Sequence, residues 1–99
     1  MENRIDYERR AEMLKALAHP VRLRIVHGLL SGGCRNVRCM EERIGISQSC
    51  LSQHLQKLRA AGVVTAERCG NEVYYRAASK EAAALVAALM GEEAESYVL

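Results

Sequence analysis

The chain has 99 residues, a net charge of +2 and neither Phe nor Trp. A chain of this length forms one small domain, here residues 1–99, with a core of aliphatic residues, Met and Tyr. No segment reaches the roughly 18 uninterrupted apolar residues of a membrane span, and the polar first residues lack a signal-peptide core. We therefore expect a cytoplasmic protein without a membrane partner.

The charge is divided unevenly along the chain. Residues 1–33 carry +2, residues 34–76 carry +3 and residues 77–99 carry −3. A basic body followed by an acidic, Ala-rich end suits a module that faces a polyanion with its first three-quarters.

Five helices and one β-hairpin are predicted from periodicity and from capping residues. Pro20 separates the first two helices, and Asn36 and Ser47 precede the next two as N-caps. Gly70 and Asn71 lie between two runs of β-forming residues, as in a hairpin with a primed turn. The expected helices are at about 7–18, 20–30, 37–44, 48–61 and 80–97, and the strands at about 63–68 and 72–77. Their expected inward residues are Met13, Leu14, Leu17, Val21, Ile25, Val26, Leu29, Leu30, Val37, Met40, Ile44, Leu51, Leu55 and Leu58.

The third and fourth helices form a helix-turn-helix at about 37–61, because a short connection containing Gly45 joins them. The recognition helix, Ser47 to Ala61, has a polar outer side whose groups both donate and accept, which suits base edges and phosphates better than a Glu/Lys surface does. The hairpin at about 63–77, with an Arg on each strand beside its tip, makes this a winged helix-turn-helix. The predicted DNA contacts are Ser47, Gln48, Ser49, Ser52, Gln53, His54, Lys57, Arg68 and Arg76.

Several runs resemble the ArsR/SmtB family of bacterial winged-helix repressors over nearly the whole chain. They are LAHPVRLRI at 17–25, ISQSCLSQHL at 46–55, LRAAGVV at 58–64 and YYR at 74–76. The resemblance implies a mainly α fold with a β-hairpin wing, in the order ααααββα. It also implies a homodimer through the first and last helices (about 7–18 and 80–97), which binds an inverted repeat in double-stranded DNA until an inducer releases it. The chain departs from the family at Glu41, where a small residue often stands at a tight helix contact.

The resemblance also implies two places for an inducer. One family site on the last helix uses His and carboxylate ligands, but the predicted helix at 80–97 has neither His nor Cys, so we expect that site to be absent. The other uses a Cys-x-Cys pair at the start of the third helix, where this chain has Asn36 and Arg38.

Four cysteines remain as candidate sensors. Cys39 and Cys50 each stand three residues after an N-cap, where the helix dipole favours the thiolate. We predict sensor thiols at Cys34, Cys39 and Cys50. Two chemistries stay open: a disulfide or polysulfide bridge between Cys34 and Cys39, or three thiolates, including Cys50 or Cys69, that bind arsenite or a soft metal. The alternative is that the cysteines are only structural, which we prefer for Cys69.

Other classes of protein fit the sequence less well. No Ser-His-Asp set, paired carboxylates or phosphate-cradling loop can be assembled, so we expect no enzyme and no required cofactor. A small thiol-redox or metal-carrier protein is the alternative from another class, but the chain has no Cys-x-x-Cys. The sequence therefore predicts a dimeric, sequence-specific repressor that a thiol-directed signal releases from DNA.

Overall fold

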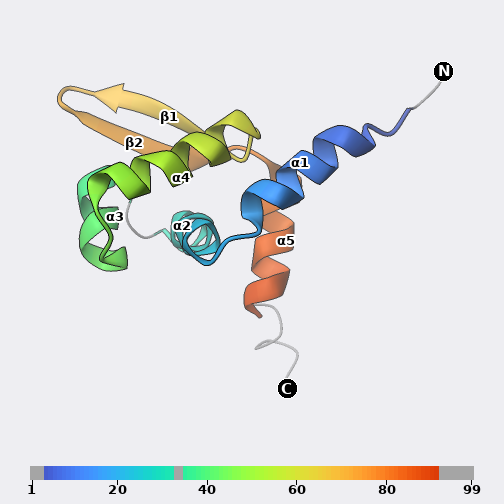
Figure 1. The fold of residues 1–99 in the computed structure, drawn as a ribbon, viewed down its shortest axis with the longest axis horizontal. Coiled ribbons are helices and arrows are strands. Elements are labelled where there is room, and N and C mark those ends of the chain that lie inside the picture. The colour runs from blue at the N-terminus through green and yellow to red at the C-terminus, as the bar shows by residue number, and fades with distance from the viewer. Residues whose placement is uncertain (1–3, 33–34, 92–99) are drawn as a thin grey trace.

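Five helices and a two-stranded antiparallel hairpin follow one another in the predicted order (Figure 1). The computed structural model describes residues 4–32 and 35–91. The elements are α1 (Tyr7–Leu17), α2 (Pro20–Leu30), α3 (Val37–Ile44), α4 (Gln48–Ala60), β1 (Val64–Cys69), β2 (Glu72–Ala77) and α5 (Lys80–Met90). No helix within these residues is both long enough and apolar enough to span a membrane.

Side-chain caps determine where α3 and α4 begin. Oδ1 of Asn36 accepts a hydrogen bond from the backbone N–H of Cys39 at 2.8 Å, and Oγ of Ser47 accepts from that of Cys50 at 3.2 Å. These bonds satisfy amide groups that a helix leaves without a partner in its first turn. Both N-caps predicted from the sequence are therefore confirmed. Gly45, with a φ of 79°, ends α3 and turns the chain toward α4.

The last helix ends earlier than predicted. α5 stops at Met90 because Gly91 has a φ of 79° and donates its N–H to the carbonyls of Ala87 and Ala88. This left-handed conformation ends a helix and favours glycine. The prediction followed the apolar Ala-rich pattern and overlooked the glycine as a stop signal. The predicted helical residues 92–97 lie outside the described part of the chain.

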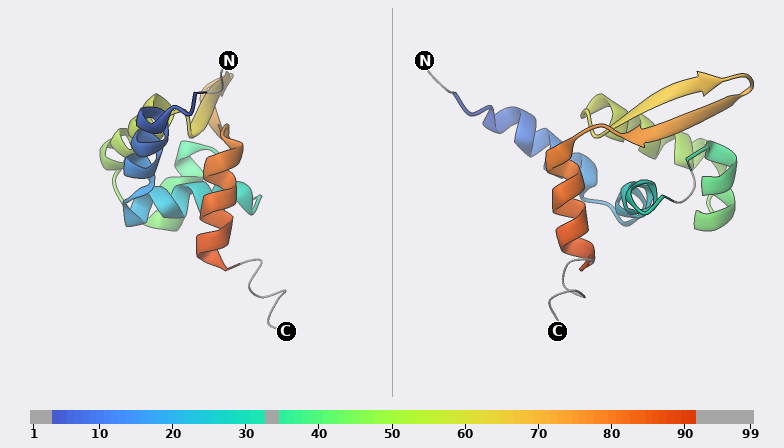
Figure 2. Two further views of the ribbon diagram at one scale, coloured as in Figure 1. Left: turned by 90° about the vertical axis from the view of Figure 1, so that its right-hand side faces the viewer. Right: turned by 180° about the vertical axis from the view of Figure 1, so that it is seen from behind.

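The core lies between α4, α2 and α5. Leu51, Leu55 and Leu58 of α4 are at most 1% exposed, which confirms the predicted inward side of this helix. The other buried apolar residues are Met13, Ala16, Leu17, Ile25, Val26, Leu29, Met40, Val63, Val64, Ala82 and Val86. Figure 2 shows α2 between α4 and α5, so α2 is the element that both outer helices pack against.

Two leucines predicted to face inward are exposed. Leu14 of α1 is 55% exposed and Leu30, at the end of α2, is 36% exposed. α1 instead packs through Met13, Ala16 and Leu17. Only one side of this helix contacts the rest of the chain, and the small Ala16 allows the close approach on that side. Hydrophobicity favours Leu14 over Ala16 as a buried residue, so hydrophobicity alone could not predict which side of α1 is buried.

The wing is hydrogen-bonded to the segment that precedes α3. The N–H of Tyr75 donates to the carbonyl oxygen of Arg35 at 2.8 Å, and Asn36 forms an isolated antiparallel bridge with Tyr74. We call these two contacts the wing link. β2 therefore pairs with β1 on one edge and, through the wing link, with residues 35–36 on its other edge.

We expect the substitution Ser79→Ala to lower the free energy of unfolding by about 1 kcal/mol, since it removes the N-cap of α5. Oγ of Ser79 is largely buried, accepts from the N–H of Ala82 at 3.1 Å and donates to Oε1 of Glu81 at 3.1 Å. The backbone N–H of Glu81 and the Ser79 hydroxyl together lower the pKa of the Glu81 carboxyl. Urea denaturation of both proteins measures the difference. The exposed Ser52→Ala should lose no stability, and an equally stable Ser79→Ala would contradict the role of this cap.

Candidate nucleic-acid interface

The outer side of α4 is polar and open to solvent. Its three buried leucines fix the rotation of the helix, so the residues between them must point away from the core. The exposed residues of this side, together with the N-cap, are Ser47, Gln48, Ser49, Ser52, Gln53, Gln56 and Lys57. We call this set the reading face. None of its members is acidic, which leaves it free to approach a polyanion.

The N-terminal end of the reading face is organised by hydroxyl groups. Oγ of Ser47 caps the N–H of Cys50 and lies 3.5 Å from Oγ of Ser49. The two hydroxyls form a small cluster of donors and acceptors at the positive end of the helix dipole. Such a helix end suits contact with a phosphate oxygen.

His54 is the predicted contact whose surroundings the sequence did not indicate. It is half-buried on the flank of α4, where its Nδ1 lies 3.5 Å from Nη1 of Arg22. Its ring lies beside that of His19, with 4.4 Å between the ring centroids and 49° between the planes. Burial lowers the pKa of His54 below its ordinary value of 6.5, and the nearby His19, Arg22 and Lys57 lower it further. These surroundings favour the neutral imidazole, which can act as a hydrogen-bond donor without carrying charge.

The two arginines of the wing lie at different places. Arg68 is opposite Val73, next to the turn at Gly70 and Asn71, whereas Arg76 is opposite Thr65, near the base of the hairpin. The prediction that both arginines flank the tip is therefore wrong for Arg76. Successive cross-strand pairs point to alternate faces of a hairpin, and the pairs that contain Arg68 and Arg76 are three steps apart. The two arginines therefore lie on opposite faces of the hairpin. Both side chains are exposed.

The three cysteines that the structure describes are Cys39, Cys50 and Cys69. Cys39 is half-buried on α3 and takes part in a disulfide bond, whereas Cys50 and Cys69 are exposed free thiols. Cys34 lies outside the described residues. In the part of the chain that the structure describes, no group of three or more His, Cys, Asp or Glu residues is arranged to hold a metal ion. The described thiols therefore supply no three-thiolate site of their own.

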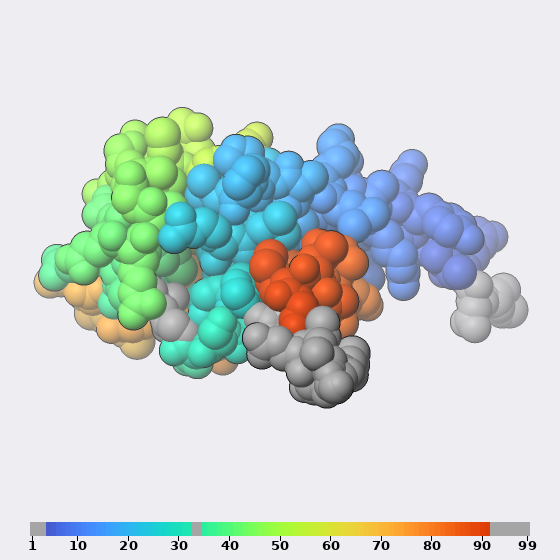
Figure 3. All heavy atoms as spheres, turned by 90° about the horizontal axis from the view of Figure 1, so that it is seen from below, coloured from blue at the N-terminus to red at the C-terminus, as the bar shows by residue number. Residues whose placement is uncertain are grey.

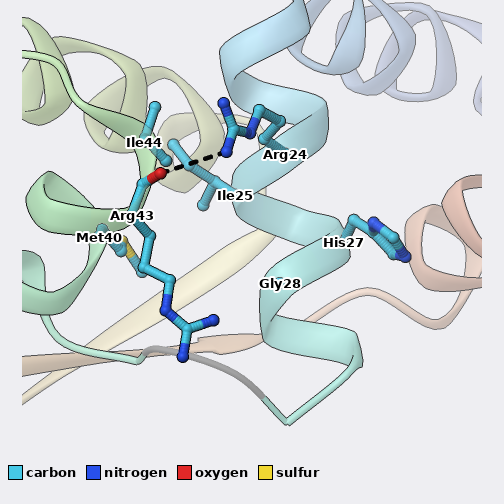
Figure 4. Close-up of a pocket in the computed structure, with 7 residues that line it drawn as sticks. All are labelled: Arg24, Ile25, His27, Gly28, Met40, Arg43 and Ile44. Atoms are coloured by element: carbon cyan, nitrogen blue, oxygen red, sulfur yellow. Dashed lines mark hydrogen bonds between the residues drawn. The ribbon is translucent and has the colours of Figure 1, made fainter.

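A small cavity of about 170 Å³ lies on another side of α2, between α2 and α3 (Figure 4). Arg24 reaches across it, and its Nη2 donates to the carbonyl oxygen of Arg43 at 3.3 Å. Ile25 and Met40 contribute apolar surface to the cavity. None of the predicted site residues lines it. The cavity lies between α2 and α3 and is not part of the reading face.

Sequence reasoning missed the part that α2 plays beside α4. Arg22 and His19 lie in the LAHPVRLRI run, which carries part of the family resemblance. The available signal was the pair of positive or titratable groups at the start of α2, one of them at the N-cap. Their contact with a residue 32 positions later could not be inferred from spacing.

Comparisons with known proteins agree with this arrangement. Residues 17–67 match a family model described as a helix-turn-helix domain. The biofilm growth-associated repressor of Xylella fastidiosa is 43% identical over 90 residues, which span 87% of this chain and 78% of that protein. The transcriptional repressor SmtB of Mycobacterium tuberculosis is 46% identical over 78 residues, which span 76% of this chain and 55% of that protein. The structure of reduced HlyU from Vibrio cholerae superposes with a TM-score of 0.78 at 35% identity, covering 84% of this chain and 86% of that one.

The helix-turn-helix, the wing and the exposed reading face define a DNA-binding regulator of transcription. The similar proteins are regulators of this class and not enzymes. The chain belongs to the ArsR/SmtB family of winged helix-turn-helix regulators. The members of the family to which it is similar include transcriptional repressors.

Proposed function

We propose that this chain is a homodimeric repressor whose α4 enters the major groove of an inverted-repeat operator. The observation that carries the proposal is the reading face, which is exposed, lacks acidic residues and is held in one orientation by Leu51, Leu55 and Leu58. An α-helix fits the major groove of B-DNA, where each base pair presents a distinct pattern of donors and acceptors.

Base readout and phosphate contact are divided along the reading face. Gln53 has an exposed amide that can pair with adenine through two hydrogen bonds, and Ser49 and Ser52 can serve either type of base. Lys57 lies on the flank, where a positive charge meets the DNA backbone and carries no sequence information. Ser47 and Gln48 at the helix start, His54 on the flank, and Arg68 and Arg76 on the wing complete the proposed contacts.

The variants Gln53→Ala and Lys57→Ala test this division. Gln53→Ala should weaken binding and relax the preference at one base pair by about 1–3 kcal/mol. Lys57→Ala should weaken all sequences about equally and reduce the slope of log affinity against log salt by roughly one. The measurement is a gel shift at several salt concentrations, on duplexes that the wild-type protein selects from a random pool. Two variants that lose affinity with unchanged base preference would contradict the role of Gln53.

Exposed apolar residues on α1 and α5 support a dimer through these two helices. They are Tyr7, Leu14, Leu85 and Leu89, with Ile5 just before α1, and they are 36% to 73% exposed. The N-terminal half of α1 projects from the rest of the molecule, so the chain itself covers little of it (Figure 3). Large exposed apolar residues on two helices that contact each other are typical of a protein interface. A dimer would also bring two copies of α4 to the two halves of an inverted repeat.

We further propose that the inducer acts on thiols, with Cys39 and Cys34 as the reacting pair. Cys39 is disulfide-bonded and the thiols of Cys50 and Cys69 are free. Hydrogen peroxide would take two electrons and two protons from the two thiols. One S–S bond then forms, and the peroxide becomes two waters. Arsenite would instead exchange hydroxides for thiolates without a change of oxidation state.

The wing link gives the thiols a route to the DNA-binding surface. The side chain of Asn36 caps the N–H of Cys39, and the backbone of residues 35–36 pairs with β2 at Tyr74 and Tyr75. The disulfide-bonded form keeps the Asn36 cap, so this route requires that the thiol or adduct form of Cys39 places its N–H differently and thereby shifts the edge against which β2 lies. The wing arginines would then shift relative to α4. Cys50 offers a second route, because an adduct there would lie on the exposed first turn of α4.

Mass spectrometry of all four cysteines, paired with DNA binding under the same conditions, tests this proposal. The protein is first reduced and is then treated in turn with arsenite, cadmium, peroxide and polysulfide. We expect at least one treatment to modify Cys39 and release DNA, and we expect Cys39→Ser to retain DNA binding but lose the response. Cys69→Ser is the matched control and should respond as the wild type does. If no treatment released DNA, the cysteines would be structural, and the chain would be a winged-helix regulator without a thiol inducer.

A further inference from the structure

A group of positive and titratable side chains at the edge of the reading face has no acidic partner among the described residues. It consists of His19 at the N-cap of α2, Arg22 on α2, and His54 and Lys57 on α4, and we call it the α2–α4 cluster. Nη1 of Arg22 lies 3.5 Å from Nδ1 of His54, and the two imidazole rings lie 4.4 Å apart. Among the described residues, neither Arg22 nor Lys57 forms an ion pair with a carboxylate.

A cavity of about 410 Å³ opens next to the cluster, between α1, α2 and α4. Its charged lining residues are Glu12, Lys15, Arg22 and Lys57. Glu12, the single acid among them, pairs with Lys15 at 3.6 Å and leaves the other two cations unbalanced. Nε of Arg22 is buried and has no hydrogen-bond partner among the described residues. A buried donor without an acceptor is unfavourable, so a shift of the Arg22 side chain toward an acceptor at the cavity would be favoured.

The two histidines each keep one N–H group available. Arginine can only donate, so Nδ1 of His54 accepts from Arg22 and the proton of this neutral ring is on Nε2. Nδ1 of His19 accepts from the backbone N–H of Val21 at 3.1 Å, which places its proton on Nε2 as well. The cluster therefore combines two permanent positive charges with imidazole N–H donors. These are the groups that bind phosphate oxygens.

We propose that the α2–α4 cluster binds a phosphate group, and that in the complex with DNA this is a backbone phosphate next to the bases read by α4. The proposal rests on the function proposed above and extends the DNA interface to α2, outside the helix-turn-helix. Arg22 supplies charge from α2, Lys57 supplies charge from α4, and His54 supplies a donor between them. Figure 2 shows the N-terminal end of α2 reaching the side of the molecule on which α4 lies, so one DNA strand can contact both.

The cluster links DNA binding to proton uptake. The groups around His54 are His19 from the turn before α2, Arg22 from α2 and Lys57 from α4, and together with burial they hold its pKa below the ordinary value. A phosphate placed among these groups favours the charged imidazole. Binding should therefore raise the pKa of His54. The affinity for DNA should then increase as the pH falls from 7 toward 6.

The variant Arg22→Gln tests the proposal in the full chain, on duplexes that the wild type selects from a random pool. Each neutralised phosphate contributes about 0.9 to the salt slope. We expect a slope smaller by about one and an affinity about fivefold to tenfold lower near 0.1 M salt, with unchanged base preference. In the double variant Arg22→Gln/Lys57→Gln, the slope should fall little further than in either single variant, because both side chains hold the same phosphate.

Arg24→Gln is the matched control. It removes the same charge from the same helix, but Arg24 points toward α3 and donates to the carbonyl of Arg43 (Figure 4). Its salt slope should equal that of the wild type. Circular dichroism checks that each variant is folded. Should Arg22→Gln fail to fold, NMR titration of His54 in the wild type with and without DNA tests the same contact, and an unchanged pKa would overturn it.

A second arm distinguishes DNA from free phosphate. Inorganic phosphate is titrated into the protein without DNA while the imidazole resonances of His54 are followed. If phosphate shifts them in the wild type but not in Arg22→Gln, and the DNA salt slope is the same in both, the site binds free phosphate and not the backbone. An unchanged slope together with no response to phosphate overturns the proposal. If the wild type selects no duplex at all, the proposed function fails, while the phosphate titration still tests the cluster.

Discussion

Replacing Leu55 by Ala should lower the free energy of unfolding by about 3 kcal/mol. Leu55 is 1% exposed and lies in the middle of the buried stripe of α4. The truncation removes apolar contacts and leaves a cavity between α4 and the rest of the core, which the surrounding helices fill only in part. Urea denaturation at one fixed protein concentration measures the effect, because the stability of the proposed dimer would depend on concentration.

The neighbouring residue on α4 provides the control. Gln56 is exposed, and Gln56→Ala should change the free energy of unfolding by no more than about 0.5 kcal/mol. A loss of less than about 1 kcal/mol for Leu55→Ala would mean that α4 is not held by its leucine stripe. The orientation of the reading face would then have no structural basis.

The substitution Leu89→Glu should shift the protein from dimer to monomer and weaken its binding to the operator by at least about a hundredfold. Leu89 is 61% exposed, so the charge does not disturb the core of a single chain. In the proposed interface it would be an unpaired charge removed from water, at a cost of about 3–5 kcal/mol. Sedimentation velocity measures the oligomeric state, and a gel shift measures the affinity.

Leu30→Glu is the control for this prediction. Leu30 is the exposed leucine at the end of α2, outside α1 and α5, and its substitution should leave the dimer intact. If Leu89→Glu stayed dimeric, another surface would join the two chains, and the proposed pairing through α1 and α5 would be wrong.

Local signals in the sequence were sufficient to predict most of the fold. The caps Asn36 and Ser47 and the Gly70-Asn71 turn each act within a few residues, so their effects are visible in the sequence itself. The errors came where tertiary packing decides. Leu14 is exposed because α1 contacts the rest of the chain along one side only, and no local pattern reports which side that is.

The candidate site was less predictable, because its important contacts are between distant residues. The reading face follows from the period of α4, but the approach of Arg22 to His54 depends on how α2 crosses α4. The wing link depends on how the chain returns to the start of α3. The place of Arg76 near the base of the wing, in contrast, could have been found by counting residues from the turn.

The wing link also bears on how such regulators can be recombined. Because β2 pairs with residues 35–36 as well as with β1, the hairpin is not an independent cassette. A chimera that takes only residues 64–77 from a relative would join a foreign strand edge to the native segment before α3. Exchanging that segment together with the hairpin would keep the paired edges matched, so the unit that can be transplanted is discontinuous in the sequence.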